Sequence, residues 1–161
     1  MAVDIYLNID PIKGESKGSG HKNEIDVLSW SWGGNQPGDF HRGSGGGVGK
    51  STFQDVHFTH YVDQASPDFY KYLATGDTSL KKATITVRKA GKEQLEYWKL
   101  TMENVLISSI STGGSSGDER MTEHVSLHFQ TFEVSYTLQK DDGGKGETKN
   151  FKWNIPEILQ V

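Results

Sequence analysis

Apolar and polar residues alternate along most of this chain, and a period of two is typical of half-buried β-strands. The clearest example is residues 83–89, ATITVRK, whose apolar side chains are expected to face inward and whose polar side chains are expected to face outward. The inward set is Ala83, Ile85 and Val87, and the outward set is Thr84, Thr86 and Arg88. The same pattern predicts strands at 3–9, 23–33, 52–62, 95–107, 125–138 and 151–155.

Two of these long segments change phase part of the way along. The apolar residues are odd-numbered up to Phe129 and even-numbered from Phe132, and a similar change separates Met102 from Val105. A phase change within one strand predicts a β-bulge and a sharp bend, which is how a sheet turns the corner of a barrel. We therefore expect long strands that bend.

One segment, residues 66–76 (SPDFYKYLATG), predicts a short helix. Ser66 can cap its N-terminus, and Gly76 can end it in the left-handed conformation. Phe69 and Leu73 would share the face that packs on the sheet, because residues spaced i and i+4 are neighbours on a helix. A helix this short needs such packing to be stable.

The whole pattern predicts a mainly β fold. We expect a single domain over 1–161, built as a compact β-barrel of about eight strands with one short flanking α-helix. The main interruption is a long Gly-rich loop at 33–50, which holds eight of the 19 glycines. Loops of that length are uncommon in globular domains and are usually functional or disordered.

The end of this loop, GSGGGVGKST at 43–52, resembles a phosphate-binding loop. Such a loop needs a strand before it and a helix after it, because the helix N-terminus binds the phosphates. Here Ser44 stands where the first glycine is required, and residues 52–62 alternate like a strand. Lys50 is therefore not expected to bind a nucleotide, and a P-loop-type nucleotide hydrolase is the weakest of the alternatives.

Composition and charge narrow the function classes. The chain has 161 residues, a net charge of −4 and no cysteine. Disulfides and thiol chemistry are excluded, and a nucleic-acid partner is disfavoured because it normally selects a basic surface. The sequence has no apolar run near the roughly 18 residues that span a membrane, and its start, MAVDIYLNID, lacks the pattern of a signal peptide. We expect neither nucleic-acid binding nor membrane insertion.

The polar residues predict no active site, metal site or cofactor site. His124 and His128 share one face of a strand but lie roughly 13 Å apart, too far to bind one metal together. His57 and His60 differ in parity and are expected to face opposite ways. We expect no enzyme activity. The tryptophans could form a sugar-binding platform if they were exposed, so a β-sandwich carbohydrate-binding module is an alternative.

Segments spread over the whole chain resemble one protein family. They are Met1–Asp10 with KGES at 13–16, EIDVL at 24–28 with WSWG at 30–33, the loop that ends in Gly49-Lys50, Phe58–Asp63 with Ser66–Tyr72, TVRKAG at 86–91, VLISSISTGGSSGDERMTE at 105–123, and WNI at 153–155. In order and spacing they resemble the haemolysin-coregulated protein (Hcp) family of bacterial type VI secretion systems.

The resemblance implies a structural protein. It implies homohexameric rings that stack into a tube inside a contractile sheath with a spike, and a lumen that holds and stabilises small effector proteins. The protein would be cytoplasmic before assembly and would then be secreted with the tube, without a signal peptide. Ser29 and Ser31 lie opposite Trp30 and Trp32 on one strand and are candidates for lumen and effector contact. The candidates for contact between stacked rings are Gly38, Asp39, Phe40, His41, Arg42, Gly49 and Lys50.

Overall fold

The computed structural model describes residues 2–41, 47–92 and 94–161, which contain one helix and thirteen strands. This confirms the mainly β class and the short helix that the sequence predicts. The helix is α1 (Ser66–Thr75), and the strands are β1 (Val3–Asn8), β2 (Ile25–Asp26), β3 (Ser29–Ser31), β4 (Gly34–Asn35), β5 (Gly38–Asp39), β6 (Gly47–Val48), β7 (Thr52–Phe53), β8 (Val56–Tyr61), β9 (Leu80–Lys89), β10 (Glu96–Gly113), β11 (Thr122–Gln139), β12 (Lys145–Asn154) and β13 (Leu159–Gln160).

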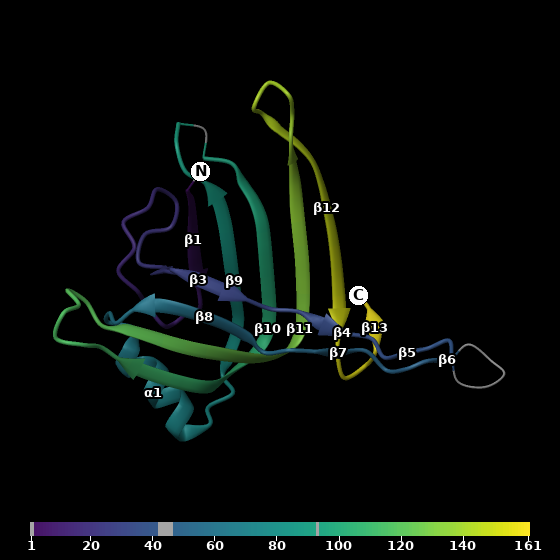
Figure 1. Ribbon diagram of the computed structural model, residues 1–161, viewed down its shortest axis with the longest axis horizontal. Helices are drawn as coiled ribbons and strands as arrows, with labels where there is room; N and C mark the ends of the chain where they lie inside the picture. Colours follow the sequence, from purple (N-terminus) through teal and green to yellow (C-terminus); the bar gives the residue numbers. More distant parts are fainter. Residues whose placement is uncertain (1, 42–46, 93) are drawn as a thin grey trace.

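The main sheet has the strand order β13-β12-β11-β10-β9-β1-β2, and its longest members are β10 and β11 (Figure 1). These two strands pair with each other along nearly their whole length. The first part of β11 also pairs with β8, and its later part pairs with β12. β8 in turn pairs with β3, so the short N-terminal strands reach the main sheet at two places.

Both long strands bend where the sequence changes phase. Their pairing skips Asn104 and Gln130 and continues on either side. Asn104 has a φ of 55°, in the left-handed region, and its Nδ2 donates a hydrogen bond to Gln130 Oε1 at 2.6 Å. Core-facing residues switch parity at this level, from Met102 to Val105 in β10 and from Phe129 to Phe132 in β11. The predicted bend is confirmed, and Figure 1 shows both strands turning there.

The strand expected over 23–33 is divided into β2 and β3. The Val27 N–H donates to Ile5 O in β1 at 2.9 Å, and the Leu28 N–H donates to Thr59 O in β8 at 2.8 Å. The chain therefore changes partner between these two residues. Because β2 and β3 are joined by the chain and not by strand pairing, the sheet is not closed at this corner.

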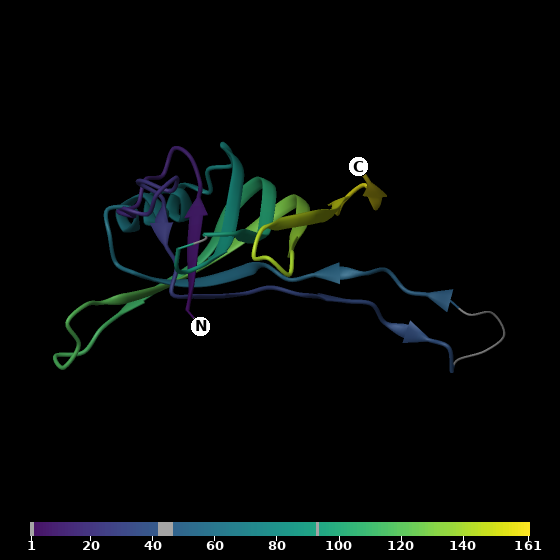
Figure 2. The ribbon, with the colours of Figure 1, turned by 90° about the horizontal axis from the view of Figure 1, so that it is seen from above.

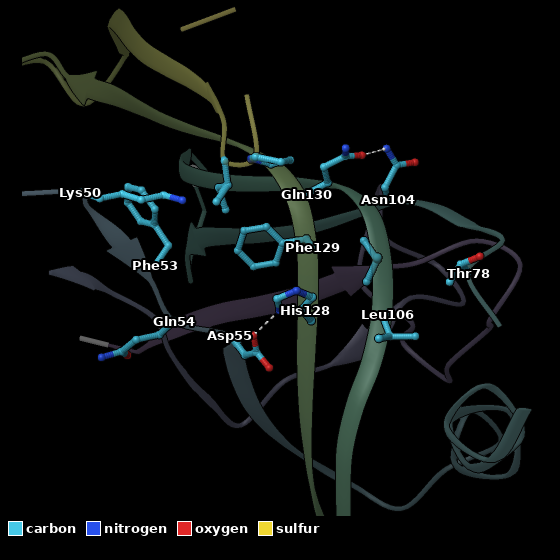
Figure 3. Close-up of a pocket in the computed structure, with 13 residues that line it drawn as sticks. Lys50, Phe53, Gln54, Asp55, Thr78, Asn104, Leu106, His128, Phe129 and Gln130 are labelled. Carbon is cyan, nitrogen blue, oxygen red and sulfur yellow. Dashed lines mark hydrogen bonds and ion pairs between the residues drawn. The ribbon is translucent and has the colours of Figure 1, made fainter. Parts of the chain in front are cut away.

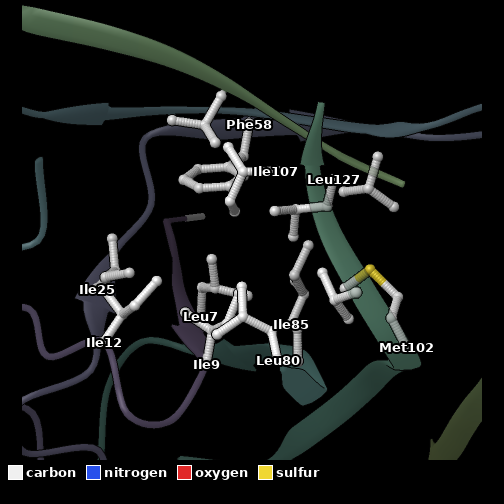
Figure 4. Close-up of a cluster of buried hydrophobic side chains, with 14 of the residues drawn as sticks. Leu7, Ile9, Ile12, Ile25, Phe58, Leu80, Ile85, Met102, Ile107 and Leu127 are labelled. Carbon is white, nitrogen blue, oxygen red and sulfur yellow. The ribbon is translucent and has the colours of Figure 1, made fainter. Parts of the chain in front are cut away.

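The core is formed by inward-facing side chains of the strands and of α1 (Figure 4). Full burial of each such aliphatic or aromatic side chain contributes about 1.5–3 kcal/mol. The inward set expected for β9 is confirmed. The largest fully buried apolar side chains are Leu7, Ile9, Ile25, Phe58, Phe69, Leu80, Ile85, Leu100, Met102, Ile107 and Leu127.

The helix ends as predicted but begins differently. Gly76 has a φ of 62° and closes the C-terminus in the left-handed conformation. Ser66 was expected to cap the N-terminus, and this is wrong, because Ser66 is already the first helical residue and Ala65 is the N-cap. The Asp63 carboxylate instead accepts a hydrogen bond from the Ala65 N–H at 2.8 Å. Phe69 anchors α1, fully buried beside Phe58.

The expectation that Thr86 and Arg88 face solvent is wrong, since they are only 4% and 5% exposed. Arg88 donates hydrogen bonds to Ser19 O at 2.7 Å and to the Tyr6 hydroxyl at 2.9 Å. Its guanidinium also lies 4.9 Å from the centre of the Tyr6 ring. The segment between β1 and β2 thus covers the outer side of β9. Alternation predicts the side of a sheet, but a distant segment decides whether that side is exposed.

His21 connects the segment between β1 and β2 to β10 through polar contacts. Its ring stacks on Tyr6, with the ring centres 4.4 Å apart. Its Nδ1 lies 2.9 Å from a carboxylate oxygen of Glu24, and its Nε2 lies 2.6 Å from one of Glu96. One largely buried imidazole therefore joins a local carboxylate to one that is distant in sequence.

Replacing Glu96 with glutamine is expected to weaken the dependence of stability on acid pH. Burial alone would raise the pKa of Glu96, but hydrogen bonds to His21 and Lys99 outweigh it and lower the pKa below its ordinary value. A carboxylate with a lowered pKa stabilises the fold above its unfolded-state pKa, and this contribution is lost as the pH falls through the folded-state pKa. Urea unfolding from about pH 6 to about pH 3 measures the slope. The exposed Glu147→Gln is the control, and equal slopes for the two variants would contradict the prediction.

Candidate functional site

Hydroxyl and imidazole side chains line the side of β3, β8 and β11 that is opposite the core. Strand pairing sets them in two rows, because Ser29 and His124 both pair with Thr59, and Ser31 and Ser126 both pair with His57. A shallow hollow of about 300 Å³ lies on this surface. We call it the Ser/His face, and its members are Ser29, Ser31, His57, Thr59, His124 and Ser126.

Hydrogen bonds across the strands hold the imidazoles of the Ser/His face in place. His57 Nδ1 lies 2.6 Å from Ser126 Oγ, and His124 Nδ1 lies 2.8 Å from Thr59 Oγ1. Ser109 in β10 extends the network by donating to Ser126 Oγ at 2.7 Å. The face is therefore an ordered polar surface whose rings are oriented by neighbouring hydroxyls.

The structure places both candidate lumen residues, Ser29 and Ser31, on the Ser/His face, where both are exposed. The opposite directions expected for His57 and His60 are confirmed, since His57 is exposed and His60 is fully buried. Sequence reasoning missed that His57 and His124 join Ser29 and Ser31 in one surface. Alternation in each strand placed these residues outward, but the strand neighbours were unknown.

Residues 33–41 and 47–53, which we call the arm, project away from the rest of the molecule (Figure 2). In the described part of the arm, β4 pairs with β7, and β5 pairs with β6. The two halves lie close together, because a Cβ at Gly49 would be only 2.5 Å from Pro37 Cγ. The segment expected as a glycine-rich loop thus contains a narrow two-stranded ribbon.

The arm carries the residues predicted to contact a stacked ring. Phe40 is 82% exposed, which is unusual for a large apolar side chain. Lys50 is followed by β7 and not by a helix, in agreement with the argument against a phosphate-binding loop. Arg42 lies outside the described residues. Of the other candidates, Gly38 and Asp39 form β5, Phe40 and His41 follow it, and Gly49 and Lys50 precede β7.

A groove of about 470 Å³ lies at the bend of β10 and β11, beside the base of the arm (Figure 3). Its floor includes Phe53 and Phe129, and Lys50 lies at its edge. The Asp55 carboxylate is 2.7 Å from His128 Nδ1 and accepts a hydrogen bond from Ser108 Oγ at 2.7 Å. Sequence reasoning missed this groove, although the phase change at Asn104 marked its position.

An apolar surface on β11 and β12 is left uncovered. It continues the core-facing side of the sheet, because Tyr136 and Phe151 lie in line with the buried Phe132. Tyr136, Leu138 and Phe151 are 44%, 42% and 38% exposed. We call these three residues the β11–β12 apolar surface. Exposed apolar side chains grouped in this way are typical of protein–protein contact sites.

The four tryptophans do not form a sugar-binding platform. Trp30, Trp32, Trp98 and Trp153 are all partly buried and pack against the core. In the part of the chain that the structure describes, no group of three or more histidine, aspartate or glutamate residues is placed to hold a metal ion. The described residues also include no helix with the length and apolar character needed to cross a membrane.

Comparison with known proteins identifies similar chains. The family model described as "Type VI secretion system effector, Hcp" matches residues 6–136. The chain is 47% identical over 163 residues to protein hcp1 of Pseudomonas aeruginosa, with 100% of both chains covered. Its structure resembles that of Hcp1 from Salmonella typhimurium, with a TM-score of 0.84 and 37% identity over 100% of both chains. It also resembles a type VI secretion system effector from Yersinia pestis, with a TM-score of 0.77 and 30% identity over 94% of this chain and 100% of the other.

Proposed function

Because the chain belongs to the Hcp family of type VI secretion proteins, we propose that it is a structural tube protein that assembles into hexameric rings. The rings stack into a tube that is expelled by the secretion system, and the lumen carries small effector proteins. The protein is cytoplasmic before assembly, and no cleaved signal is needed for export. One observation carries this proposal. The chain has three separate surfaces, suited to a neighbour within a ring, a neighbour in the next ring and a cargo protein.

The β11–β12 apolar surface supports contact between copies within a ring. It combines uncovered apolar side chains with a strand, β12, that pairs with β13 only at Trp153 and Asn154 in the described residues. The remaining edge of β12 has backbone groups that a neighbouring chain can pair with. A second copy of this chain is the proposed occupant, because closed rings repeat one interface between identical chains.

The arm supports contact between stacked rings. It extends beyond the body of the molecule, with β5 and β6 far from the main sheet (Figure 1). The exposed Phe40 directly follows β5. Covering an exposed apolar side chain with a second protein stabilises the complex, because apolar surface is removed from water. The proposed contacts in the described arm are Gly38, Asp39, Phe40, His41, Gly49 and Lys50. Arg42 is proposed as a contact from the sequence alone.

The Ser/His face supports a role as the lumen surface. Ser29 and Ser31 are small, polar and exposed, and they lie on the outside of the sheet rather than among apolar side chains. An uncharged polar surface can hold different proteins weakly through hydrogen bonds. The sheath would surround the outer side of the tube and the spike would lie at its end, as in the system to which the family belongs.

Light scattering of the purified protein is expected to give the mass of six chains of 17.9 kDa each. Replacing residues 36–51 with an Asn-Gly turn, which suits the paired ends of β4 and β7, is expected to keep this mass. The same variant is expected to lose stacking at high protein concentration, as seen by electron microscopy. A monomer for the wild-type protein contradicts the ring, and undiminished stacking of the shortened variant contradicts the role of the arm.

Replacing Ser31 with tryptophan is expected to leave the ring mass unchanged and to reduce the amount of small protein that co-purifies with the ring. The bulky ring would fill the hollow of the Ser/His face without touching the β11–β12 apolar surface. Quantitative mass spectrometry of affinity-purified rings measures the retained protein. Ser116→Trp in the turn between β10 and β11 is the matched control. Full retention by the Ser31 variant would remove Ser31 from the proposed cargo surface.

A further inference from the structure

The groove at the bend of β10 and β11 lies in a gap of the main sheet. β10 occupies one edge of β11 along most of its length. The other edge of β11 pairs with β8 as far as Leu127 and with β12 from Thr131 onward. In the described residues, no strand pairs with 128–130 on this second edge. The groove of about 470 Å³ therefore lies where β8 and β12 diverge (Figure 3).

The floor of this groove is apolar. Phe53 packs against the core and Phe129 is buried, so the floor continues the core of the molecule. Ile155 and Pro156, which follow β12, also line the groove. Its volume is within the range of roughly 300–1,000 Å³ that is common for binding pockets. Because aromatic rings pack well at an angle to one another, a floor with two phenyl rings suits an aromatic side chain.

Phe40 on the arm is the aromatic side chain that lacks such a contact. It is 82% exposed, and the next most exposed large apolar side chain of the described residues, Val161, is 56% exposed. Phe40 directly follows β5, which lies far from the main sheet in both views (Figures 1 and 2). The groove lies at the base of the arm, so Phe40 does not reach the groove of its own chain. A second copy of the chain has the same groove.

We propose that the groove receives Phe40 from the arm of another copy of this chain, in the next ring. The inference rests on the proposed function, in which the arm contacts a stacked ring, and it names the site that the arm occupies. Lys50 and Phe53 belong both to the arm and to the groove. The docked arm of one copy therefore lies beside the base of the arm of the next copy. Such a head-to-tail contact joins two different surfaces of identical chains, and repeating it in one direction extends a stack without closing it.

The size of this contact suits rings better than single chains. One aromatic side chain buries about 150–250 Å², whereas a stable interface between two proteins buries about 1,200–2,000 Å². Phe40 and the groove are thus too small to hold two single chains together. Between two rings the same contact is repeated by every chain, and each further contact forms within a complex that already exists. The contact therefore favours stacking of rings that have formed beforehand.

Disulfide cross-linking tests the position of the arm, because the natural chain has no cysteine. The variant His41→Cys, Gln54→Cys places one thiol beside Phe40 and one among the groove residues. A disulfide forms only where the two Cα atoms come within about 7 Å. Oxidation of stacked rings is expected to give a ladder beyond six chains on a non-reducing gel, because contacts between rings connect chains along the whole stack. His41→Cys, Ser116→Cys is the control and is expected to give no such ladder.

Stacking measurements test the contribution of Phe40 and of the groove separately. Phe40→Ala is expected to keep the ring mass and to raise the protein concentration needed for stacking at least about tenfold, because the loss is repeated by every chain of the ring. Phe40→Leu is expected to keep most of the stacking. Leu106→Trp fills the groove from β10 and is expected to match Phe40→Ala. The double variant Phe40→Ala, Leu106→Trp is expected to add no further loss, since both changes remove one contact.

Each outcome decides the proposal. A ladder that stops at six chains places the contact within one ring and overturns it, and so does the absence of a ladder. Unchanged stacking of Phe40→Ala overturns it too. A ladder from Val161→Cys, Gln54→Cys, with none from His41→Cys, Gln54→Cys, assigns the groove to the C-terminal segment instead of Phe40. Light scattering under reducing conditions tests the ring separately. Monomers that still give the ladder on oxidation at high protein concentration would contradict the ring and leave the contact between arm and groove in place.

Discussion

Replacing Glu123 with alanine is expected to lower the free energy of unfolding by about 3–5 kcal/mol. Glu123 and His60 both have fully buried side chains, and His60 Nε2 lies 3.0 Å from Glu123 Oε1. Thr112 Oγ1 donates a hydrogen bond to the other carboxylate oxygen at 2.7 Å. Alanine leaves the buried His60 Nε2 without its carboxylate partner, and a buried polar group without a partner is costly. Thr112 is exposed and keeps the Tyr70 hydroxyl as a partner at 2.6 Å, so it adds little to the loss. Urea unfolding at one fixed protein concentration measures the change.

Two further variants distinguish the effect of breaking the buried pair from the effect of simply removing a glutamate side chain. Glu103 in β10 pairs with Lys152 at 3.0 Å, and both side chains are partly exposed. Glu103→Ala is therefore expected to cost less than about 1 kcal/mol. The double variant His60→Leu, Glu123→Met removes both buried polar groups and is expected to recover much of the loss. A loss for Glu123→Ala no larger than that for Glu103→Ala would contradict the prediction.

Replacing Phe69 with alanine is expected to cost about 3–5 kcal/mol in the free energy of unfolding. Phe69 is fully buried, and its ring lies edge-on to Phe58 at 5.9 Å and to His60 at 5.7 Å. The substitution leaves a cavity between α1 and the sheet, and α1 is too short to be stable without that contact.

The matched control for Phe69→Ala is Lys71→Ala, an exposed position in the same helix that is expected to change stability by less than about 0.5 kcal/mol. Urea unfolding followed by circular dichroism measures both variants. A loss of less than about 1 kcal/mol for Phe69→Ala would mean that the surrounding side chains close the cavity, and the prediction would be wrong.

Much of the fold was predictable because it follows from local patterns. Alternation predicted β1, β9 and most of β10 and β11, and it predicted which side of each strand faces the core. The bend at Asn104 and Gln130 was also predictable, because the apolar parity changes there in the sequence itself. The helix was predictable from Phe69, Leu73 and the terminal Gly76, which act within one short segment.

The candidate surfaces were predictable only in part. Ser29 and Ser31 could be assigned to one side of a strand, since two residues separated by one position point the same way. That His57 and His124 lie beside them depends on the pairing of β3 with β8 and of β8 with β11. The high glycine content marked the arm, but the pairing within it depends on contacts between its two halves.

Residue order alone was enough to give the strand pattern, the bend, the short helix and the similarity to the Hcp family. These depend on residue order, because side-chain direction in a strand has a period of two wherever the strand lies. The tertiary structure alone decided that Thr86 and Arg88 are buried, that His21 joins Glu24 to Glu96, and that two imidazoles share a surface with Ser29 and Ser31. Burial and polar contacts depend on which distant segment lies opposite, and alternation carries no information about that segment.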